Sequence, residues 1–399
     1  MGSHPKLLDG IRVVDLSTFV TGGFCSLMLA NQGADVIKVE QPGSGDDIRH
    51  SGPPFIDGDS PYYWTVNYGK RSVELDLGSD AGLAALYDLA ASADVLVQNF
   101  RPGTAERLGV GYDAVRDRNK SVVYCDISAF GDSGPWSERP GYDLLVQGLS
   151  GIMSVTGEPD GGPAKVGLPV TDLVTAMWAA FGIMSGLYRR SRTGEGEYVE
   201  LGMLDAILPW LTKQAGTVFA GETPRRMGTK DPVLAPYQTF KTADGYINVA
   251  CLNEKLWRAF CGAIGRKDLL DDDRFAGNAR RVKHMDALEA EFRETLSERP
   301  TDGWMETLVD AGVPAAPVQD VSDALYNEQT DARGMVHSIE DDGNEIPVVE
   351  HPLNFEHLAS GFETPPPDLG EHNREVFREL GYDEAAIDAM TERGAFGGS

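Results

Sequence analysis

The sequence predicts an α/β protein whose parallel β-sheet is covered by helices on both faces. β-rich runs alternate with helical segments over the first 130 residues, which is the pattern of strands joined by crossover helices. The length of 399 residues leaves room for two domains. A stretch rich in Pro, Gly and charged residues, 221–238, resembles a linker. We therefore expect a smaller α+β domain at 226–330, and a large domain made of 1–225 and 331–399.

The first part of the chain supplies the strands of the expected sheet. Its β-rich runs are separated by segments with helical spacing or an Ala-rich composition. The expected strands are 11–17, 35–40, 71–77, 94–100 and 121–128, and the expected helices are 22–33, 80–93 and 104–119. Ligands on such sheets bind beyond the carboxyl ends of the strands.

The remaining elements are less regular. Asp244-Gly245 between two β-rich runs is typical of a hairpin turn. The expected helices are 143–153, 172–190, 204–220, a series within 254–308 and a closing pair in 373–390; the expected strands are one in 196–204 and hairpins in 236–251 and 335–355.

Composition excludes some classes of partner. The formal net charge is −27 at pH 7, and such a surface repels nucleic acid and anionic lipid. At molar salt the Debye length falls to about 3 Å, so self-repulsion is screened. We expect a salt-adapted (halophilic) protein with no nucleic-acid or membrane partner, although an ordinary acidic enzyme has a similar composition.

The chain carries no pattern of a secreted, membrane or metal protein. The apolar run 173–187 is too short and interrupted to predict a membrane span, and the first residues lack the apolar segment of a signal peptide. Cys25, Cys125, Cys251 and Cys261 show no CxxC pair or metal spacing. We therefore expect a soluble cytoplasmic protein with reduced cysteines and no metal site.

The loops after the strands suggest a ligand. The first such loop, 17–24, lacks the GxGxxG of dinucleotide-binding proteins, although Glu40 stands where a ribose-binding acid would lie. Asn99, Arg101 and Arg107 belong to a segment at the carboxyl end of the strand 94–100 that opens a helix, where anions are favoured. A phosphate-rich ligand and ordinary surface salt bridges account equally well for these basic residues.

Carboxylates are the remaining candidates for a nucleophile. No GxSxG segment and no Cys–His or Ser–His–Asp set can be picked by spacing. Asp172 stands at the start of an apolar helix, and spacing alone favours a helix cap over a reactive group. Asp143 likewise stands at a helix start, with Tyr142 before it, and a cap with a packed ring is the simplest interpretation there.

Seven segments together resemble family III of the CoA-transferases, which includes formyl-CoA transferase, the carnitine CoA-transferases and α-methylacyl-CoA racemase. They follow the family order over nearly the whole chain. The segments are GADVIKVEQPGSGDDIR, GKRSVELDL, DVLVQNFRPG, RPGYDLLVQGLSGIMSVTGEPDGGP, GLPVTDL, GVPAAPVQDV and LGEHNREVFRELG.

The resemblance implies a fold and a chemistry. The large domain would be Rossmann-like, with the small domain inserted, and two subunits would interlock as a homodimer. Asp172 matches the family's nucleophile, which carries a mixed anhydride and then a CoA thioester. No cofactor would be bound permanently, because coenzyme A enters as acyl-CoA substrate.

CoA-binding positions carry over by motif. They are Val20, Thr21, Gln41, Leu75, Asn99, Phe100, Arg101, Arg107, Pro140, Gly141, Tyr142 and Asp143. Gln41 departs from the family, in which an arginine there can stack on adenine, so that contact is in doubt.

The resemblance also favours some of the possible reactions over others. A racemase of the family would need a histidine where Tyr142 stands, so a transferase is favoured over a racemase. A dinucleotide-dependent oxidoreductase and a non-catalytic nucleotide-binding subunit are the alternatives outside the family. A haloarchaeal family member moves CoA from succinyl-CoA to mesaconate, and the acidic composition is similar. We therefore expect succinyl-CoA as donor and a C4–C5 dicarboxylate such as mesaconate, itaconate or malate as acceptor.

Overall fold

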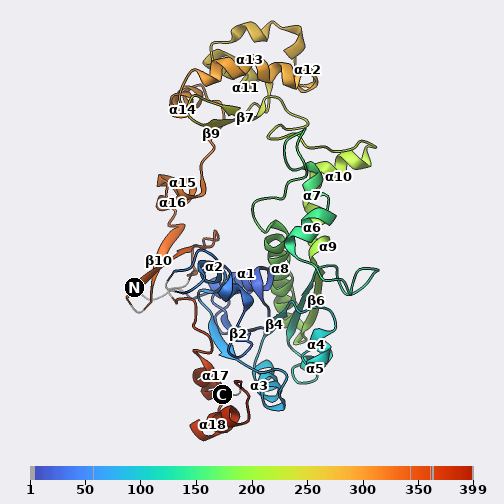
Figure 1. The fold of residues 1–399 in the computed structure, drawn as a ribbon, viewed down its shortest axis with the longest axis vertical. Coiled ribbons are helices and arrows are strands. Elements are labelled where there is room, and N and C mark those ends of the chain that lie inside the picture. The colour runs from blue at the N-terminus through green and yellow to red at the C-terminus, as the bar shows by residue number, and fades with distance from the viewer. Residues whose placement is uncertain (1–4, 57, 342, 360, 362–363, 398–399) are drawn as a thin grey trace. The chain divides into compact units, whose positions relative to one another are not determined.

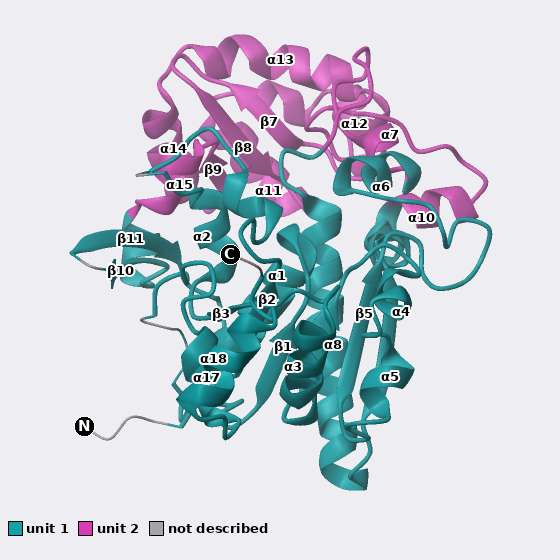
Figure 2. Ribbon diagram, turned by 60° about the horizontal axis from the view of Figure 1, so that its bottom comes forward, with its two compact units in different colours: residues 1–150, 166–213, 328–399 teal, residues 151–165, 214–327 magenta. Residues whose placement is uncertain are grey.

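The computed structural model describes residues 5–56, 58–341, 343–359, 361 and 364–397. The chain forms two compact units, which are coloured separately in Figure 2. Unit 1 contains 1–150, 166–213 and 328–399, and unit 2 contains 151–165 and 214–327. The domains expected from the sequence have boundaries different from those of these units. They concern parts of the chain that would fold independently, and they stay a prediction.

Unit 1 is built on a six-stranded sheet in which every neighbouring pair is parallel. The strands are β1 (Arg12–Asp15), β2 (Asp35–Glu40), β3 (Arg71–Glu74), β4 (Val95–Gln98), β5 (Val123–Ser128) and β6 (Glu197–Gly202), in the order β3-β2-β1-β4-β5-β6. The chain first moves outward from β1 to β3 and then returns to place β4 on the other side of β1. The predicted parallel α/β sheet is confirmed.

Successive residues of the strands are buried on opposite faces of the sheet, as the pleat requires. Val13 and Val95 belong to the core that helices α1 (Phe19–Asn31) and α8 (Val170–Thr193) cover. Val14 and Leu96, one residue later in each strand, belong to the opposite core. Central strands of this kind are apolar on both faces, which is why their sequences show apolar runs instead of strict alternation.

The opposite core is closed by helices from both ends of the chain. It contains residues of α3 (Asp80–Ala91), α5 (Tyr112–Arg116), α17 (Asn373–Glu379) and α18 (Glu384–Glu392). Figure 1 shows α17 and α18, coloured for the C-terminus, beside the N-terminal part of the fold. Unit 1 also contains a hairpin of β10 (Val336–Asp341) and β11 (Asn344–Val349). Its other helices are α2 (Pro61–Asn67), α4 (Thr104–Arg107), α6 (Asp143–Leu149), α9 (Met203–Ile207) and α16 (Glu328–Ala332).

Unit 2 has its own core. Its sheet is antiparallel, in the order β7-β8-β9 (Tyr237–Lys241, Tyr246–Ala250 and Ala315–Pro317). Aromatic side chains of the sheet and of two helices, such as Phe240, Phe260 and Phe292, pack edge to face in this core. The helices are α7 (Ile152–Val155), α11 (Glu254–Ala263), α12 (Asn278–Lys283), α13 (Met285–Ser297), α14 (Thr301–Asp310), α15 (Val321–Leu325) and most of α10 (Thr212–Phe219), whose first two residues belong to unit 1. Both hairpins predicted from the sequence are confirmed.

Three expected helices are wrong in their extent, because Gly or Pro interrupts them. The helix expected at 104–119 is two short helices, separated near Gly109, which adopts a left-handed φ of 75°. Gly151, with a φ of 86°, divides the helix expected at 143–153 in the same way. The helix expected at 204–220 is broken around Pro209, whose missing N–H ends the regular hydrogen bonding.

Candidate active site

A cavity of about 620 Å³ lies beyond the carboxyl ends of β1, β4 and β5. The loops that follow these strands line it, together with the start of α8. This is the point at which the strand order reverses, between β1 and β4. Ligands of open α/β sheets bind at such a reversal, because the two flanking loops diverge there and leave a crevice.

A second cavity, of about 300 Å³, lies beyond the ends of β2 and β3. It shares Thr18, Asp47 and Phe100 with the larger cavity. The two cavities therefore adjoin, and an elongated ligand could occupy both.

Most of the site residues predicted from the sequence line one of these two cavities. Gln41 and Leu75 line the smaller cavity, and Phe100 lines both. The larger cavity is lined by Val20, Thr21, Asn99, Arg101, Pro140, Gly141, Tyr142, Asp143 and Asp172. Arg107, the last residue of α4, is exposed and lines neither of these cavities.

Sequence reasoning missed several residues that line the larger cavity. Thr18 and Phe19 lie where the first loop meets α1, and Arg139 lies two residues before Gly141. These three residues lie beside residues that the sequence did indicate, and that proximity could have pointed to them. Tyr62 comes from α2, a helix that the sequence did not predict.

Asp172 is not the cap of its helix, and that prediction is wrong. Helix α8 begins at Val170, and the cap position is Pro169, which offers no side-chain acceptor. Asp172 is therefore the third helical residue. Its carboxylate turns to the neighbouring helix α1, where it accepts a hydrogen bond of 2.7 Å from the hydroxyl of Thr21.

The surroundings of Asp172 make its carboxylate more basic than usual. Burial raises the pKa of Asp172 to about 6, the Thr21 hydrogen bond opposes this rise, and the negative charge of Asp143 adds to it. The positive end of the α8 dipole lies at this turn as well, and it favours the ionised carboxylate, so it also opposes the rise in pKa. The group is thus ionised at pH 7 but poorly solvated, which favours its use as a nucleophile or base.

Asp143 holds the start of α8 from another helix. Its carboxylate accepts hydrogen bonds from the Thr171 backbone N–H at 2.9 Å and from the Thr171 hydroxyl at 2.7 Å. A third hydrogen bond of 2.7 Å comes from Gln147. The simple cap of its own helix is therefore wrong, and so is the packing role of Tyr142, which is 59% exposed. Asp143 fixes the backbone next to Asp172.

The raised pKa of Asp172 gives a pH prediction. We expect kcat/KM for an acyl-CoA substrate to be flat near pH 8 and to fall about tenfold per pH unit below pH 6, because only the carboxylate attacks. In Asp143→Asn the acid limb should move to lower pH, since a negative neighbour is lost, while turnover persists because the amide oxygen still accepts from Thr171. A wild-type profile that stays flat to pH 4.5, or an acid limb that moves upward in the variant, would contradict this account of the site.

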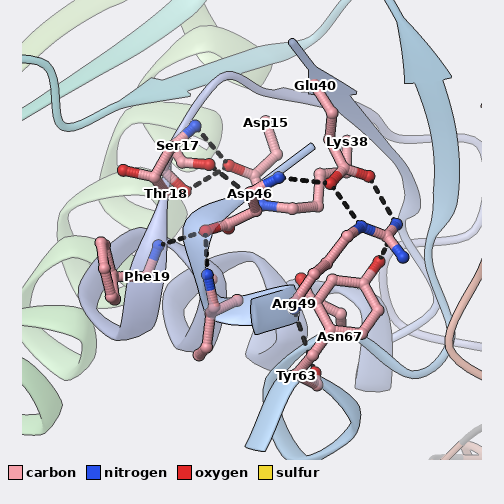
Figure 3. A network of polar contacts seen from close by, with 12 residues as sticks. Asp15, Ser17, Thr18, Phe19, Lys38, Glu40, Asp46, Arg49, Tyr63 and Asn67 are labelled. Carbon is pink, nitrogen blue, oxygen red and sulfur yellow. Dashed lines mark hydrogen bonds and ion pairs between the residues drawn. The ribbon is translucent and has the colours of Figure 1, made fainter. Parts of the chain in front are cut away.

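The first loop is fixed by a buried ion pair (Figure 3). Lys38 contacts Asp46 at 2.7 Å, and both side chains are almost completely buried, with exposures of 0% and 1%. The Lys38 ammonium also donates to the Ser17 carbonyl at 3.0 Å. Asp46 in turn accepts from the Phe19 backbone N–H at 3.0 Å. Lys38 and Asp46 therefore hold two successive parts of the loop.

Further contacts complete the loop. The Asn99 side chain accepts from the Thr18 N–H at 2.9 Å and donates to the Thr18 carbonyl at 2.8 Å. Phe19 has a φ of 58°, and this left-handed conformation is strained for an aromatic residue. Such strain persists because the surrounding contacts determine the backbone conformation of the loop.

Two further features bear on what this site can hold. The described residues contain no group of three or more His, Cys, Asp or Glu side chains that could bind a metal ion. Among the described helices, α8 alone is long and apolar enough to cross a membrane by length and composition. Ala176, Ala179 and Ile183 of this helix are buried in the core beside the sheet, as in a core helix of a globular fold.

Known proteins resemble this chain over almost its full length. A family model described as CoA-transferase family III matches residues 8–373. A succinate–glutarate CoA-transferase of Agrobacterium fabrum is 37% identical, over 95% of this chain and 97% of that protein. A succinyl-CoA:mesaconate CoA-transferase of Haloarcula marismortui is also 37% identical, over 97% and 98% respectively. The crystal structure of a CAIB/BAIF family protein from Brucella suis superposes with a TM-score of 0.87 at 36% identity, covering 94% of this chain and 100% of that chain.

Proposed function

The chain belongs to family III of the CoA-transferases, and on that premise we propose that it moves CoA from succinyl-CoA to a small dicarboxylic acid through intermediates on Asp172. The observation that carries the proposal is the partly buried carboxylate of Asp172, which lines the larger cavity and has a pKa raised to about 6.

The first half-reaction loads CoA onto Asp172. Its carboxylate attacks the thioester carbonyl of succinyl-CoA, the C–S bond breaks, and a mixed anhydride and CoA thiolate result. The thiolate then attacks the aspartyl carbonyl of the anhydride, which releases succinate and leaves an Asp172–CoA thioester. The Thr21 hydroxyl, 2.7 Å from the resting carboxylate, is placed to donate to the oxyanion that develops at the aspartyl carbonyl.

The second half-reaction reverses these steps with the acceptor. The acceptor carboxylate attacks the Asp172 thioester, which gives a second mixed anhydride and CoA thiolate. The thiolate attacks the acceptor carbonyl of this anhydride, and the acceptor leaves as its CoA thioester while the Asp172 carboxylate is restored. Each step exchanges one activated acyl group for another, so no external energy source is needed.

The two adjoining cavities, of about 620 and 300 Å³, suit an elongated ligand such as an acyl-CoA. We place the adenine in the smaller cavity, between Gln41 and Leu75, and the thioester in the larger cavity beside Asp172. Phe100 lines both cavities, so the pantetheine chain would pass it. Gln41 offers an amide in place of a guanidinium, and we therefore expect hydrogen bonding to adenine at that position instead of cation–π stacking.

A transferase fits the cavity better than a racemase. Among the described residues that line the larger cavity there is no histidine, and Tyr142 stands where the racemase branch would place one. The dicarboxylate acceptor is supported by the relatives, whose names pair succinyl-CoA with glutarate or mesaconate. Mesaconate is our leading acceptor.

We also propose that the protein is a cytoplasmic, salt-adapted homodimer. Helix α8 leaves Met177, Trp178 and Phe181 exposed although it is a core helix, and a second copy of the chain would cover this apolar surface. The net charge of −27 suits a salt-rich solution. For this reason the assay is run in molar KCl and repeated at about 50 mM salt, where screening extends beyond about 10 Å and we expect weaker activity.

The test of the proposed function is a substrate panel. The enzyme is incubated with succinyl-CoA and mesaconate, glutarate, itaconate, malate, oxalate, carnitine or cinnamate, and new acyl-CoAs are identified by mass spectrometry. We expect CoA thioesters of the C4–C5 dicarboxylates. If only oxalate accepts CoA, the expected C4–C5 length of the acceptor is wrong, and if only carnitine or cinnamate accepts CoA, the dicarboxylate class is wrong. If no acid accepts CoA, the proposed activity is wrong.

A further inference from the structure

The larger cavity is lined by two guanidinium groups that form no ion pair with any described carboxylate. Among the described residues around it, the positive charges are those of Arg101 and Arg139. Neither forms an ion pair within the described part of the chain, whereas Arg49 and Arg71 of the same unit are held by carboxylates. The chain has 62 acidic residues against 35 Lys and Arg, so an arginine left free beside a cavity is available for an anionic ligand.

Arg139 is held close to the start of α8 by a short loop. It lies four residues before Asp143, which binds the Thr171 backbone next to Asp172. Four residues span at most about 14 Å. The loop is also pressed against the end of β5, because a Cβ atom at Gly141 would lie only 2.3 Å from the Cβ of Ala129. Only glycine allows this approach.

Arg139 is positioned by contacts with Trp136. Its backbone N–H donates to the Trp136 carbonyl at 2.8 Å, which closes a turn. Its guanidinium lies 5.0 Å from the centre of the Trp136 ring. Stacking on an aromatic face leaves the N–H groups at the edge of the guanidinium free to bind a carboxylate in a bidentate manner.

The two arginines are placed for different anions. Arg101 directly follows Phe100, which lines both cavities, so it lies where the diphosphate of a bound CoA would pass. Like Arg101, Arg139 lines the larger cavity and not the smaller one, but it comes from the loop after β5, four residues before Asp143, which binds the backbone next to Asp172. It therefore lies on the side of the acyl group.

We infer that Arg139 binds the free carboxylate at the far end of the acyl group and thereby selects dicarboxylates. This inference rests on the proposed function. In both half-reactions Asp172 is joined to an acyl chain that ends in a second carboxylate, succinyl in the first and the acceptor in the second. The guanidinium of Arg139 binds the distal carboxylate of the acyl chain in both half-reactions, so the selectivity for the donor and the selectivity for the acceptor have the same origin.

The test compares substrates that differ in that carboxylate alone. Wild type, Arg139→Gln and Arg139→Lys are assayed for transfer from succinyl-CoA to glutarate and from butyryl-CoA to pentanoate. We expect the kcat/KM of Arg139→Gln for glutarate to fall about 10- to 100-fold, mostly through KM, as for the loss of a charge-assisted hydrogen bond. The kcat/KM for pentanoate should change less than about twofold, and Arg139→Lys should recover part of the loss for glutarate.

Arg293→Gln is the matched control, because Arg293 is an exposed residue of α13 in unit 2, and it should leave both rates unchanged. If wild type transfers CoA to glutarate but Arg139→Gln keeps its preference, or loses both reactions equally, the assignment of Arg139 is overturned. If wild type transfers CoA to neither acid of the pair nor to any dicarboxylate, the proposed function fails first, and the assignment of Arg139 with it.

Discussion

Asp172→Asn is expected to abolish CoA transfer while leaving the fold intact. An amide forms neither the anhydride nor the aspartyl thioester, so kcat should fall by at least about 10⁴-fold, as for removal of other covalent nucleophiles. The Asn side chain has the same size, and its carbonyl can still accept the Thr21 hydrogen bond that Asp172 accepts at 2.7 Å. Transfer is measured with succinyl-CoA and glutarate, and the fold by circular dichroism and thermal unfolding.

Stability gives this variant a second readout. The pKa of Asp172 is raised in the folded chain from 3.8 to about 6, so the folded state binds its proton more tightly than the unfolded state does. The wild type therefore loses stability as pH rises from about 4 to about 6, and Asp172→Asn lacks that loss. At pH 8 the variant should be at least as stable as wild type. Near wild-type exchange by a preparation that mass spectrometry shows to be free of deamidation would contradict the nucleophile assignment.

Lys38→Met is expected to destabilise unit 1 more than any surface substitution. It leaves Asp46 charged and buried without its cation at 2.7 Å, and breaking a buried pair in this way costs about 3–5 kcal/mol of the free energy of unfolding. Chemical denaturation in molar KCl measures this loss. The affinity for CoA should fall as well, because Lys38 and Asp46 fix Ser17 and Phe19 in the first loop.

Two matched variants separate the buried charge from the loss of a long side chain. Lys120→Met removes an exposed lysine, and we expect a change within about 0.5 kcal/mol. Lys38→Met combined with Asp46→Asn should recover part of the stability, because the amide carries no unpaired charge and still accepts from Phe19. A single Lys38→Met variant as stable as the Lys120→Met control would show that the ion pair does not hold this loop.

The sheet of unit 1 could be predicted because its signal is local. Val13 and Val14 are both apolar because each lies in a separate core, and the alternation of such runs with helices implies a parallel sheet. The interruptions of the helices were harder to predict, since a single Gly such as Gly109 or Gly151 is compatible with a helix until its φ is known.

The site was predictable to the extent that it lies in recognisable segments. Asp172 was identified through its family motif, but its real hydrogen-bond partner, Thr21, lies 151 residues away. The cap of α8 comes from Asp143 on another helix, and no local pattern encodes such a contact. Arg139 lies in one of the recognised segments, but it was overlooked because nothing distinguishes an exposed arginine in a loop from its neighbours until the cavity beside it is known.

The most direct measurement of the central claim is the trapping of the intermediate. Wild-type enzyme is mixed with succinyl-CoA, without acceptor, and treated with hydroxylamine or borohydride before proteolysis and peptide mass spectrometry. We predict modification of the peptide that carries Asp172, dependent on succinyl-CoA, and no modification in Asp172→Asn. Active transfer with an unmodified Asp172 peptide, or modification of another carboxylate instead, would contradict the account.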